Sequence, residues 1–591
     1  MKNIDVLKRA YKPVFERPYL IITNIINIIC GGILPILSIY ALTIISEEIV
    51  SGSLPMEDII WIIGIYAVLG LVLNLGVVLT SNLTYSEYNH IRSLFFVDIT
   101  KKITTMDFKH YEDPRIMDKV ETALSGVSSN NTGVEGVYHK IFDIGKQILS
   151  AIILGVIVAK ASPIIILVIL IALFIEFKTS KIISEYKFSR RDEISNIERK
   201  SVFYATSASD FNYGKDMRTY PMEEKFGEYF RREQENLKRI AGEFYKKERN
   251  YSVIQILSIV VADIISMVIL VRITGNTISI PEFVKYLTSV TVLMTVLRTI
   301  FLDLANIREN LMYTKNTYEF LDMELIEEGG ERISFSGLPL ELKLENITFS
   351  YPGSDKKVFD NISFTIKEGE SLALVGLNGA GKTTLVKLIT GLYKADGGKV
   401  YYNGIDSTKF SSKDKFKLFS VVFQDINPLA FTVAENVAAN IEDIDRNRVK
   451  EKLDEVGLLE KIESLPKGID TMMYKVIDEE GIVLSGGENQ KLIIARALYK
   501  KDTSMLIFDE PTSSLDALAE EKIYRELDNM IQGRTTLFIS HRLASTRFCD
   551  KIMLINKGEI EEVGTHEELI DMDGMYCHMY ETQGKYYKEA N

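Results

Sequence analysis

Six long apolar segments in the first half of the chain constrain its fold more than any other feature. Each approaches the ~20 residues that a helix needs to cross the ~30 Å hydrocarbon core of a bilayer. Backbone polar groups find no water in that core, so such segments form helices whose hydrogen bonds are internal. We therefore expect six transmembrane helices over Tyr19–Ser46, Ile59–Thr80, Ile141–Ala159, Pro163–Phe177, Ser252–Val271 and Phe283–Phe301.

The third and fourth segments are nearly continuous, but together they are too long for one crossing. A helix over Ile141–Phe177 would extend ~55 Å at 1.5 Å per residue. Lys160, Ser162 and Pro163 lie at its centre. The pattern predicts a tight turn there and two separate helices.

Basic residues indicate the orientation in the membrane. Lys and Arg gather in the N-terminal segment and in Ser81–Gly136 and Lys178–Asn250, whereas the first inter-helix loop carries Glu47, Glu48, Glu57 and Asp58. The positive-inside rule therefore predicts a cytoplasmic N-terminus and long cytoplasmic extensions of the helices. We expect a multi-pass protein of the cell (cytoplasmic) membrane, in contact with the lipid bilayer.

Composition excludes several other classes. The chain has 591 residues, which favours two or more domains, and a net charge of −12, which argues against nucleic acid as a partner. Three cysteines without close spacing form neither a disulfide framework nor a zinc site. We expect no cleavable signal peptide and, because the first helix begins near Tyr19, no peptidase domain ahead of it.

Polar residues inside the apolar segments are candidates for a substrate path. Asp263 and Arg298 are costly inside a bilayer, and they form either an ion pair with each other or with lipid headgroups, or a contact to substrate. Thr288, Thr291, Thr295 and Thr299 recur at helical spacing, as a helix–helix seam or as the polar wall of a transport path. We prefer the path, and single out Asp263, Thr291, Thr295 and Arg298.

The second half reads as a soluble α/β domain with a phosphate-binding loop. The segment Leu340–Glu345 alternates apolar and charged residues, as a strand does. A short apolar strand, Leu372–Val375, leads into Gly376–Thr384, which fits GxxxxGK[ST] and precedes an apolar-periodic helix. In this context the loop amides surround phosphate, Lys382 reaches the β- and γ-phosphates, and Thr383 binds Mg²⁺.

Further strand ends carry polar side chains suited to phosphoryl transfer. Met505–Phe508 runs into Asp509 and Glu510, one to hold the metal and one to orient or deprotonate water. His541 follows Leu537–Ser540 and is expected to contact the γ-phosphate, and Gln424 follows Leu418–Phe423 and binds either the metal or the attacking water. Tyr351 either stacks on adenine or is a core residue.

A second glycine motif, Leu484-Ser485-Gly486-Gly487-Glu488, opens a predicted helix that extends to Tyr499. The N–H groups and the positive end of a helix N-terminus make a cradle for phosphate. Two cradles in one chain are explained if two chains hold one ATP between them.

Together these residues resemble the ABC transporter superfamily, and in particular half-size exporters. Gly376–Thr384 matches the Walker A motif, Gln424 the Q-loop and Leu484–Glu488 the signature motif; Met505–Glu510 matches Walker B, Ser514–Asp516 the D-loop and His541 the switch histidine. The resemblance implies a multidomain fold: an all-α polytopic membrane domain of six helices over residues 1–325, a linker over 326–339, and an α/β P-loop NTPase domain of the ABC type over 340–591.

The resemblance also implies the site and its cofactors, ATP and Mg²⁺. Glu510 and His541 are then catalytic, and Thr383, Gln424 and Asp509 are the metal ligands. The expected ATP-binding residues are Tyr351, Gly376, Asn378, Gly379, Ala380, Gly381, Lys382, Thr383, Thr384, Gln424, Ser485, Gly486, Gly487, Glu488 and Asp509. Glu479–Gly481 resembles the segment that senses the membrane domain, and Phe108–Asp118 and Phe211–Tyr220 resemble coupling helices.

Two residues depart from the family pattern. The signature of such exporters usually ends in glutamine, where this chain has Glu488, and Lys491 stands where arginine is usual. A carboxylate there either weakens phosphate binding or points toward ribose or solvent.

We expect an ATP hydrolase coupled to the export of a peptide, drug-like molecule or lipid by alternating access, with a weak preference for peptides. Its partner is a second half-transporter chain, preferably an identical one, although a heterodimer also fits. The alternative is an ABC-type sensor or gated pore that uses ATP for signalling. Candidate cavity residues are Asn24, Asn27, Asn74, Asp263, Thr291, Thr295 and Arg298.

Overall fold

The structure is a computed structural model that describes residues 3–52, 54–220, 222–274, 279–326, 339–424, 427–475, 477–511 and 533–588. The chain divides into two compact units, which we describe one at a time. The first comprises Met1–Thr104 and Asp118–Met323, and the second comprises Thr105–Met117 and Glu324–Asn591. A short piece of the N-terminal half therefore packs with the C-terminal half.

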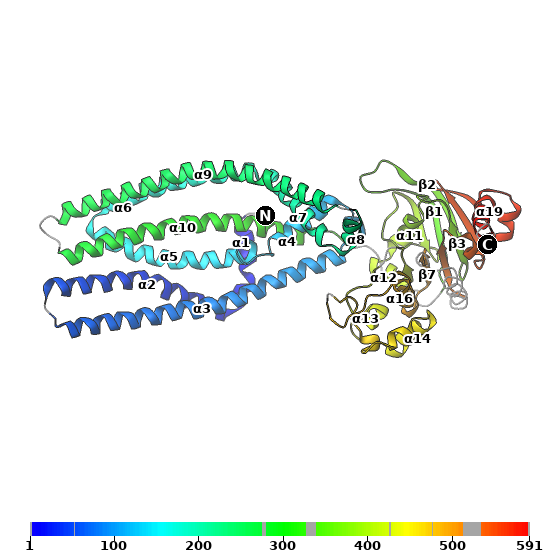
Figure 1. Ribbon diagram of the computed structural model, residues 1–591, viewed down its shortest axis with the longest axis horizontal. Helices are drawn as coiled ribbons and strands as arrows, with labels where there is room; N and C mark the ends of the chain where they lie inside the picture. The colour runs from blue at the N-terminus through cyan, green and yellow to red at the C-terminus, as the bar shows by residue number, and fades with distance from the viewer. Residues whose placement is uncertain are drawn as a thin grey trace. The chain divides into compact units, whose positions relative to one another are not determined.

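The first unit is entirely helical in the residues described (Figure 1). Its elements are α1 (Asn3–Phe15), α2 (Pro18–Ser51), α3 (Met56–Thr105), α4 (Pro114–Ser125), α5 (Gly133–Ala161), α6 (Pro163–Ser189), α7 (Arg191–Ser209), α8 (Phe211–Thr219), α9 (Glu223–Thr274) and α10 (Ile280–Leu321).

Six of these helices, α2, α3, α5, α6, α9 and α10, are long and apolar enough to cross a membrane. All six predicted crossings are therefore confirmed. The expected turn is also present, because α5 ends at Ala161, Ser162 is extended, and α6 begins at Pro163. The helices exceed the apolar segments in length, and α9 has 52 residues, which is about 78 Å at 1.5 Å per residue.

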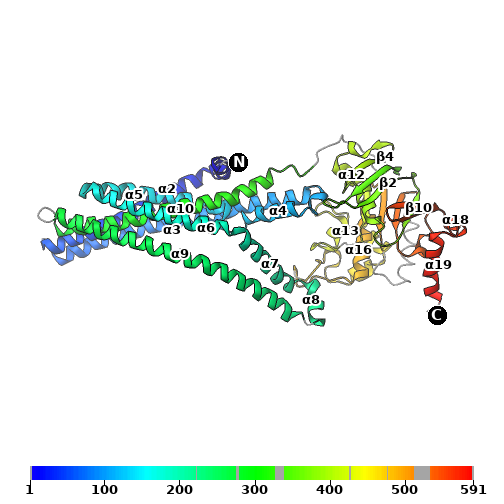
Figure 2. The same ribbon diagram turned by 90° about the horizontal axis from the view of Figure 1, so that it is seen from above.

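The helices of the first unit pack in sequence-distant pairs. Helix α5 lies along α10 and α2, and α6 lies along α9, as Figures 1 and 2 show. A buried apolar cluster joins α2, α5, α6, α9 and α10 through residues such as Leu154, Ile169 and Leu293. Many large apolar side chains on α3 and α9 remain exposed, as expected of helices that face lipid.

The second unit contains two β-sheets. The strands are β1 (Leu342–Ser350), β2 (Lys357–Ile366), β3 (Ser371–Val375), β4 (Gly397–Tyr402), β5 (Ile405–Asp406), β6 (Phe419–Val422), β7 (Met505–Asp509), β8 (Thr535–Ile539), β9 (Lys551–Asn556) and β10 (Glu559–Gly564). One sheet is antiparallel, in the order β2-β1-β4-β5. The other has the order β10-β9-β3-β8-β7-β6 and is parallel except for β10.

Helices complete the second unit. They are α11 (Lys382–Ile389), α12 (Ser412–Leu418), α13 (Val433–Ala438), α14 (Arg446–Glu455), α15 (Leu459–Glu463), α16 (Gly486–Tyr499), α18 (His566–Asp571) and α19 (Met575–Lys588). Single 3-10 turns lie at η1 (Phe108–His110), η2 (Ser407–Lys409), η3 (Gly468–Asp470) and η4 (Leu543–Thr546).

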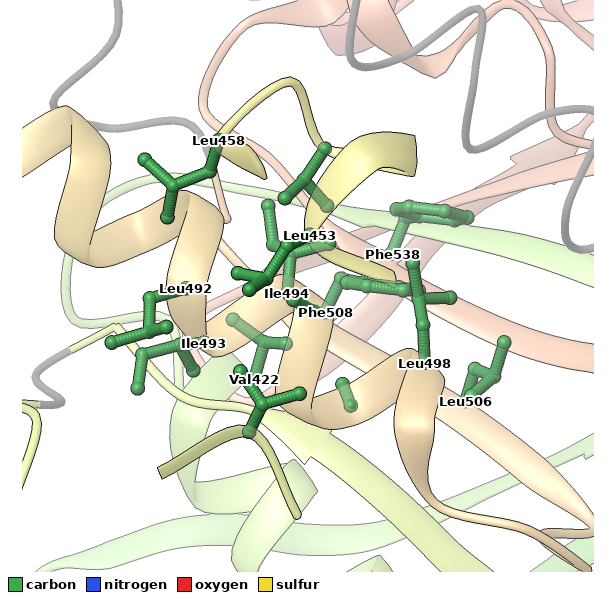
Figure 3. Close-up of a cluster of buried hydrophobic side chains, with 14 of the residues drawn as sticks. Val422, Leu453, Leu458, Leu492, Ile493, Ile494, Leu498, Leu506, Phe508 and Phe538 are labelled. Atoms are coloured by element: carbon green, nitrogen blue, oxygen red, sulfur yellow. The ribbon is translucent and has the colours of Figure 1, made fainter. Parts of the chain in front are cut away.

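The parallel sheet is buried on both faces, since every residue of β3, β7 and β8 is buried. Alternate side chains enter different cores. Ala373 and Val375 pack in a cluster with α13, α14 and α16, whereas Leu372 and Leu374 pack with the antiparallel sheet and α11. Figure 3 shows part of the first cluster, including Leu453 of α14, Leu492 of α16 and Phe508 of β7. This double burial fixes the sheet register and therefore the positions of the strand ends that carry the site.

Candidate active site

Four neighbouring strands of the parallel sheet, β3, β8, β7 and β6, carry the predicted catalytic residues at or just beyond their carboxyl ends. In open α/β sheets ligands bind outside these ends. Because the register aligns the strands, residues that are far apart in sequence meet at this edge. The described structure brings together Lys382, Thr383, Gln424, Asp509, Glu510 and His541 in this way.

The phosphate-binding loop joins β3 to α11. Gly381 caps α11 with φ of 102°, a left-handed conformation, and an added Cβ there would lie 2.8 Å from the Phe359 ring. Lys382 is buried and folds back on the loop, donating from Nζ to the carbonyl oxygens of Gly376 at 2.9 Å and Leu377 at 3.2 Å. Its ammonium is thus held within the loop by the loop's own backbone.

Asp509 is a buried carboxylate with one oxygen engaged. The Thr383 hydroxyl donates to Oδ2 at 2.8 Å, and Oδ1 is buried without a hydrogen-bond partner. Burial is the main cause that raises the pKa of Asp509 to about 6, the Thr383 hydrogen bond opposes it, and the Glu510 charge adds to it. A buried, half-satisfied carboxylate of this kind is suited to a cation.

These residues fit a magnesium ion. Mg²⁺ takes oxygen ligands from one or two carboxylates together with substrate phosphates rather than from a dense protein cage. Asp509 Oδ1 and the Thr383 hydroxyl supply oxygens of that kind, and Gln424 has an amide oxygen beside them. Among the described residues no group of three or more His, Cys, Asp or Glu could hold a metal ion.

Glu510 lies at the centre of the predicted catalytic group. Its φ is 51°, a left-handed conformation that a residue other than glycine adopts at a cost, and its N–H donates to Ile539 O at 3.0 Å. Gln424 Nε2 donates to Glu510 Oε2 at 2.7 Å, and His541 Nε2 lies 2.5 Å from Oε1. Both carboxylate oxygens are therefore held by side chains from neighbouring strands.

The electrostatics favour a neutral imidazole beside this carboxylate. Burial lowers the pKa of His541, and the charge of Lys382 lowers it further. Burial also lowers the pKa of Lys382, although Glu510 and Asp509 act in the opposite direction. A neutral His541 has one nitrogen to donate and one to accept, which a proton-handling role requires.

Tyr351 lies beside the phosphate loop. Its hydroxyl is 2.7 Å from Thr384 Oγ1, and its ring makes edge contacts with Phe349 and Tyr393. The residue is half-buried. The contacts with Phe349 and Tyr393 are those of a core tyrosine, and the partial exposure leaves room for a ligand beside the ring. Stacking of Tyr351 on adenine stays a prediction.

The signature motif opens α16, as predicted, although the helix begins at Gly486, two residues before the expected start. Ser485 is the N-cap, and with Glu488 it forms a capping box: Oγ accepts from Glu488 N at 3.4 Å and Glu488 Oε2 accepts from Ser485 N at 2.9 Å. The first-turn N–H groups of Gly486 and Gly487 have no acceptor within the helix and suit an anion.

Within the second unit, the segment Thr105–Met117 packs near α11 and the candidate site. Glu112 accepts from Lys387 Nζ at 3.1 Å and from the Tyr393 hydroxyl. The Phe108 ring meets that of Tyr393 edge-on at 5.9 Å, and Lys387 Nζ lies 5.2 Å from the centre of the Phe108 ring. Lys387 also lies 5.7 Å from the ring of Tyr351. Sequence reasoning singled out this segment, but not its contacts with Lys387 and Tyr393.

Other predicted elements are placed as follows. Phe211–Tyr220 contains a short helix, α8, as expected of a coupling helix. Glu479–Gly481 forms a turn before the signature, in which Glu480 pairs with Lys467 at 2.8 Å. The predicted D-loop, Ser514–Asp516, lies outside the described residues, and so does nearly all of the predicted linker.

The structure corrects two of the candidate cavity residues in the membrane helices. Asn24 and Asn27 are buried in the packing of α2 against α3. Asn24 donates to Tyr88 Oη at 2.7 Å, and Asn27 donates to Thr80 Oγ1 at 2.6 Å and to Ser81 Oγ at 2.9 Å. These two α2 amides donate to hydroxyl groups of α3 across the helix pair rather than line a cavity. Asn74 is exposed and bonds its own helix at Gly70 O.

Asp263 and Arg298 do not pair with each other, which was one of the alternatives that the sequence left open. Arg298 Nε donates to Glu176 Oε1 at 2.6 Å, joining α10 to α6, and Glu176 is buried. Sequence analysis missed Glu176, although it is an acid at the end of an apolar segment. Asp263 Oδ1 on α9 is buried without a hydrogen-bond partner.

The threonines of α10 bond their own helix. Thr291, Thr295 and Thr299 each donate to the carbonyl four residues earlier, at 2.9–3.2 Å. Thr291 and Thr295 are exposed in the single chain. Their role in a substrate path stays a prediction.

The phosphate loop, the acidic end of β7 and the signature helix together define a nucleotide-binding domain of the ABC type. Residues 359–513 match the ABC transporter family model. A protein of Ralstonia nicotianae described as an ATP-dependent lipid A-core flippase is 33% identical over 343 residues, which cover 56% of each chain. A protein of Pseudomonas aeruginosa with the same description is 34% identical over 327 residues, covering 55% of this chain and 53% of that one. The chain thus spans about half the length of the curated relatives it matches.

A solved structure supports the fold of the whole chain. It is that of a bacterial Atm1-family ABC exporter with ATP bound, with a TM-score of 0.77 and 20% identity, covering 96% of this chain and 98% of that one. The part of the chain that matches the ABC transporter model follows six helices that are long and apolar enough to cross a membrane, and the chain shares its overall fold with this exporter. The predicted fold class and the predicted location in the cell membrane are confirmed.

Proposed function

We propose that this chain is an ATP hydrolase that exports an amphipathic substrate by alternating access, as a pair of chains. The observation that carries the proposal is the arrangement around Glu510, whose two carboxylate oxygens are held by Gln424 and His541 beside the Lys382 loop. A carboxylate fixed next to a phosphate cradle is what water activation at the γ-phosphate requires.

The proposed division of labour follows from the contacts. Lys382 exchanges its two loop carbonyls for the β- and γ-phosphates, and the glycine-rich loop surrounds them. Glu510 orients the attacking water and accepts its proton, and the N–H that neutral His541 directs at Glu510 Oε1 turns to the γ-phosphate when ATP is bound. Asp509, Thr383 and Gln424 would hold Mg²⁺, which when bound neutralises charge on the phosphates.

The proposal includes a second chain. Ser485, Gly486 and Gly487 offer a helix N-terminus to an ATP molecule held by the Walker A loop of the partner, so that closure of two nucleotide-binding domains completes each site. ATP then shifts the inward–outward equilibrium by its differential affinity for the closed pair. An identical partner is the simplest form of this proposal.

The domain boundaries proposed are a membrane domain over residues 1–325, a linker over 326–339 and a nucleotide-binding domain over 340–591. Thr105–Met117 is proposed as the coupling segment, because it is continuous with α3 and α4 and its Glu112 bonds to Lys387 and Tyr393.

For the cargo we propose an amphipathic lipid. The relatives are named as lipid A-core flippases, which favours a lipid over the peptide preferred from sequence. The candidate path residues agree with an amphipathic cargo: Thr291 and Thr295 are exposed with their hydroxyls bonded to α10, and Arg298 is offset by Glu176. Such a surface has modest polarity and little net charge.

The test is reconstitution of the full-length protein in lipid vesicles with a fluorescently labelled lipid and, separately, a labelled amphipathic peptide. The proposal expects ATP-dependent movement of the lipid to the other leaflet, lost in Glu510→Gln. Movement of peptide alone would overturn the cargo, and ATP hydrolysis that opens an ion current without moving either probe would favour the gated pore.

A further inference from the structure

Both departures from the family signature contact one short segment, residues 457–463, which contains α15. Glu488 pairs with Lys461 of α15, and Lys491 donates from Nζ to Gly457 O at 3.4 Å. Glu488 and Lys491 lie three residues apart on α16 and so face the same side of that helix. The segment therefore lies against the part of the signature helix where this chain differs from the usual family signature.

The carboxylate of Glu488 is fully engaged within its own chain. Oε2 accepts from the N–H of Ser485 at 2.9 Å, and Oε1 accepts from Lys461 Nζ at 2.6 Å. The side chains are partly covered, with 25% of Glu488 and 44% of Lys461 exposed. Burial alone would raise the pKa of Glu488, but Lys461 and the Ser485 N–H outweigh it and lower the pKa. Glu488 is therefore charged at neutral pH.

A charged Glu488 favours its own helix but opposes an incoming triphosphate. A carboxylate in the first turn interacts well with the helix dipole and with the N-cap. The same N-terminus is the proposed cradle for phosphate, so an uncompensated carboxylate would repel the ligand. With Lys461 beside it, the pair is formally neutral, as the usual glutamine is.

We propose that Lys461 is a positioning residue of the signature, which offsets the charge of Glu488 and holds its carboxylate away from the phosphates. This inference rests on the proposed function and deepens it. Lys461 acts through Glu488 rather than on ATP, and the Lys491–Gly457 contact keeps the segment against α16.

The experiment compares the removal of the Lys461 charge with and without the Glu488 charge. The KM for ATP and kcat are measured for the full-length protein in vesicles as wild type, K461M, K461R, E488Q and K461M/E488Q. We expect K461M to raise KM about fivefold, the scale of a partly exposed ion pair, and to change kcat less. K461R should stay within about twofold of wild type, because it keeps the charge.

The decisive comparison is K461M in the E488Q protein, where we expect KM to change less than about twofold. A salt titration is the second readout, because raising the ionic strength to about 1 M shortens the screening length to roughly 3 Å and should shrink the K461M effect. Lys450→Met is the matched control: it breaks the 2.9 Å pair between Lys450 of α14 and Glu463 of α15 without touching the signature, and Lys450 is about as exposed as Lys461, at 47% against 44%.

The outcomes separate this inference from the function on which it rests. An equal rise in KM on adding K461M to wild type and to E488Q would mean a purely structural role for Lys461 and would overturn the inference. So would an unchanged KM in K461M. Either result leaves the proposed function standing as long as the wild type hydrolyses ATP; a wild type that neither hydrolyses ATP nor gains thermal stability from it overturns both.

Discussion

The side-chain amide of Gln424 donates a 2.7 Å hydrogen bond to Oε2 of Glu510 in the single chain. Gln424 follows β6 and Glu510 follows β7, and these strands are adjacent in the parallel sheet. The sheet itself therefore places Gln424 beside the proposed base within one chain. Preorganised polar groups of this kind need little rearrangement during the reaction.

Replacing Glu510 with glutamine should lower ATP hydrolysis by about 10²–10³-fold, because the amide cannot accept the proton of the attacking water. The similar shape should preserve ATP binding and leave a trapped ATP-bound pair of chains. Steady-state ATPase assays measure the loss of hydrolysis, and native mass spectrometry detects the trapped ATP-bound pair of chains. Full turnover by the variant would overturn the assignment of Glu510.

Asp509→Asn should stabilise the protein when metal and nucleotide are absent. The folded-state pKa of about 6 lies above the ordinary value of 3.8, so the fold favours the protonated form, and that contribution is lost as pH rises through about 6. Two pKa units correspond to roughly 3 kcal/mol as an upper limit. The melting temperature in chelator should therefore rise more at pH 8 than at pH 5.

The Asp509 prediction has an internal control. Saturating ATP and Mg²⁺ should raise the melting temperature of the wild type more than that of the variant, because the variant lacks the carboxylate that would hold the ion. Equal stabilisation by D509N at both pH values would contradict the burial argument.

Glu112→Gln should weaken communication between cargo and ATPase. Glu112 accepts hydrogen bonds from Lys387 and Tyr393, and burial, followed by the bond to Glu112, raises the pKa of Tyr393. We expect cargo-stimulated hydrolysis to fall about fivefold while basal hydrolysis stays within about twofold. Tyr393→Phe, which loses only the hydroxyl, should have part of this effect, and Glu368→Gln, an exposed glutamate beyond β2, is the control. Unchanged stimulation in both test variants would exclude this contact as a coupling element.

Arg298→Gln should destabilise the membrane domain by about 1–3 kcal/mol, because Glu176 is then buried without its cation. Glu176→Gln should cost less, since the Arg298 side chain is 44% exposed and can reach water. The double variant should recover most of the loss. Thermal unfolding in detergent of the two single variants and the double variant measures the coupling between the two side chains. Additive losses would indicate that the 2.6 Å pair contributes no stability.

Local sequence predicts much of this structure. Some features depend only on residues that are close in sequence, so residue type and spacing predict the backbone geometry directly. They are the phosphate loop, the two acids after Met505–Phe508 and the Ser485 cap. The six crossings follow from the length of the apolar segments, and the Ser162 turn follows from the excess length.

Partners across helices were not predictable in the same way. The sequence shows on which side of an apolar helix a polar residue lies, but the residue it meets there depends on how the helices pack. Asn27 is an example: the sequence suggests a cavity residue, and the structure shows a hydrogen bond to Thr80. An ion pair between Asp263 and Arg298 is one of the alternatives that the sequence allows, but the packing of α10 against α6 gives Arg298 the partner Glu176 instead. Lys461 precedes Glu488 by 27 residues with no periodic relation, and only the fold of the segment before α16 brings them together.

The bonds from Lys382 to Gly376 and Leu377 have a consequence for the cycle of the enzyme. The Lys382 ammonium supports the curvature of the Walker A loop from inside, through two carbonyl oxygens of the loop itself. In the proposed function, ATP binding replaces these two carbonyl oxygens with phosphate oxygens. Loading the site is then an exchange of ligands on one lysine rather than a refolding of the loop.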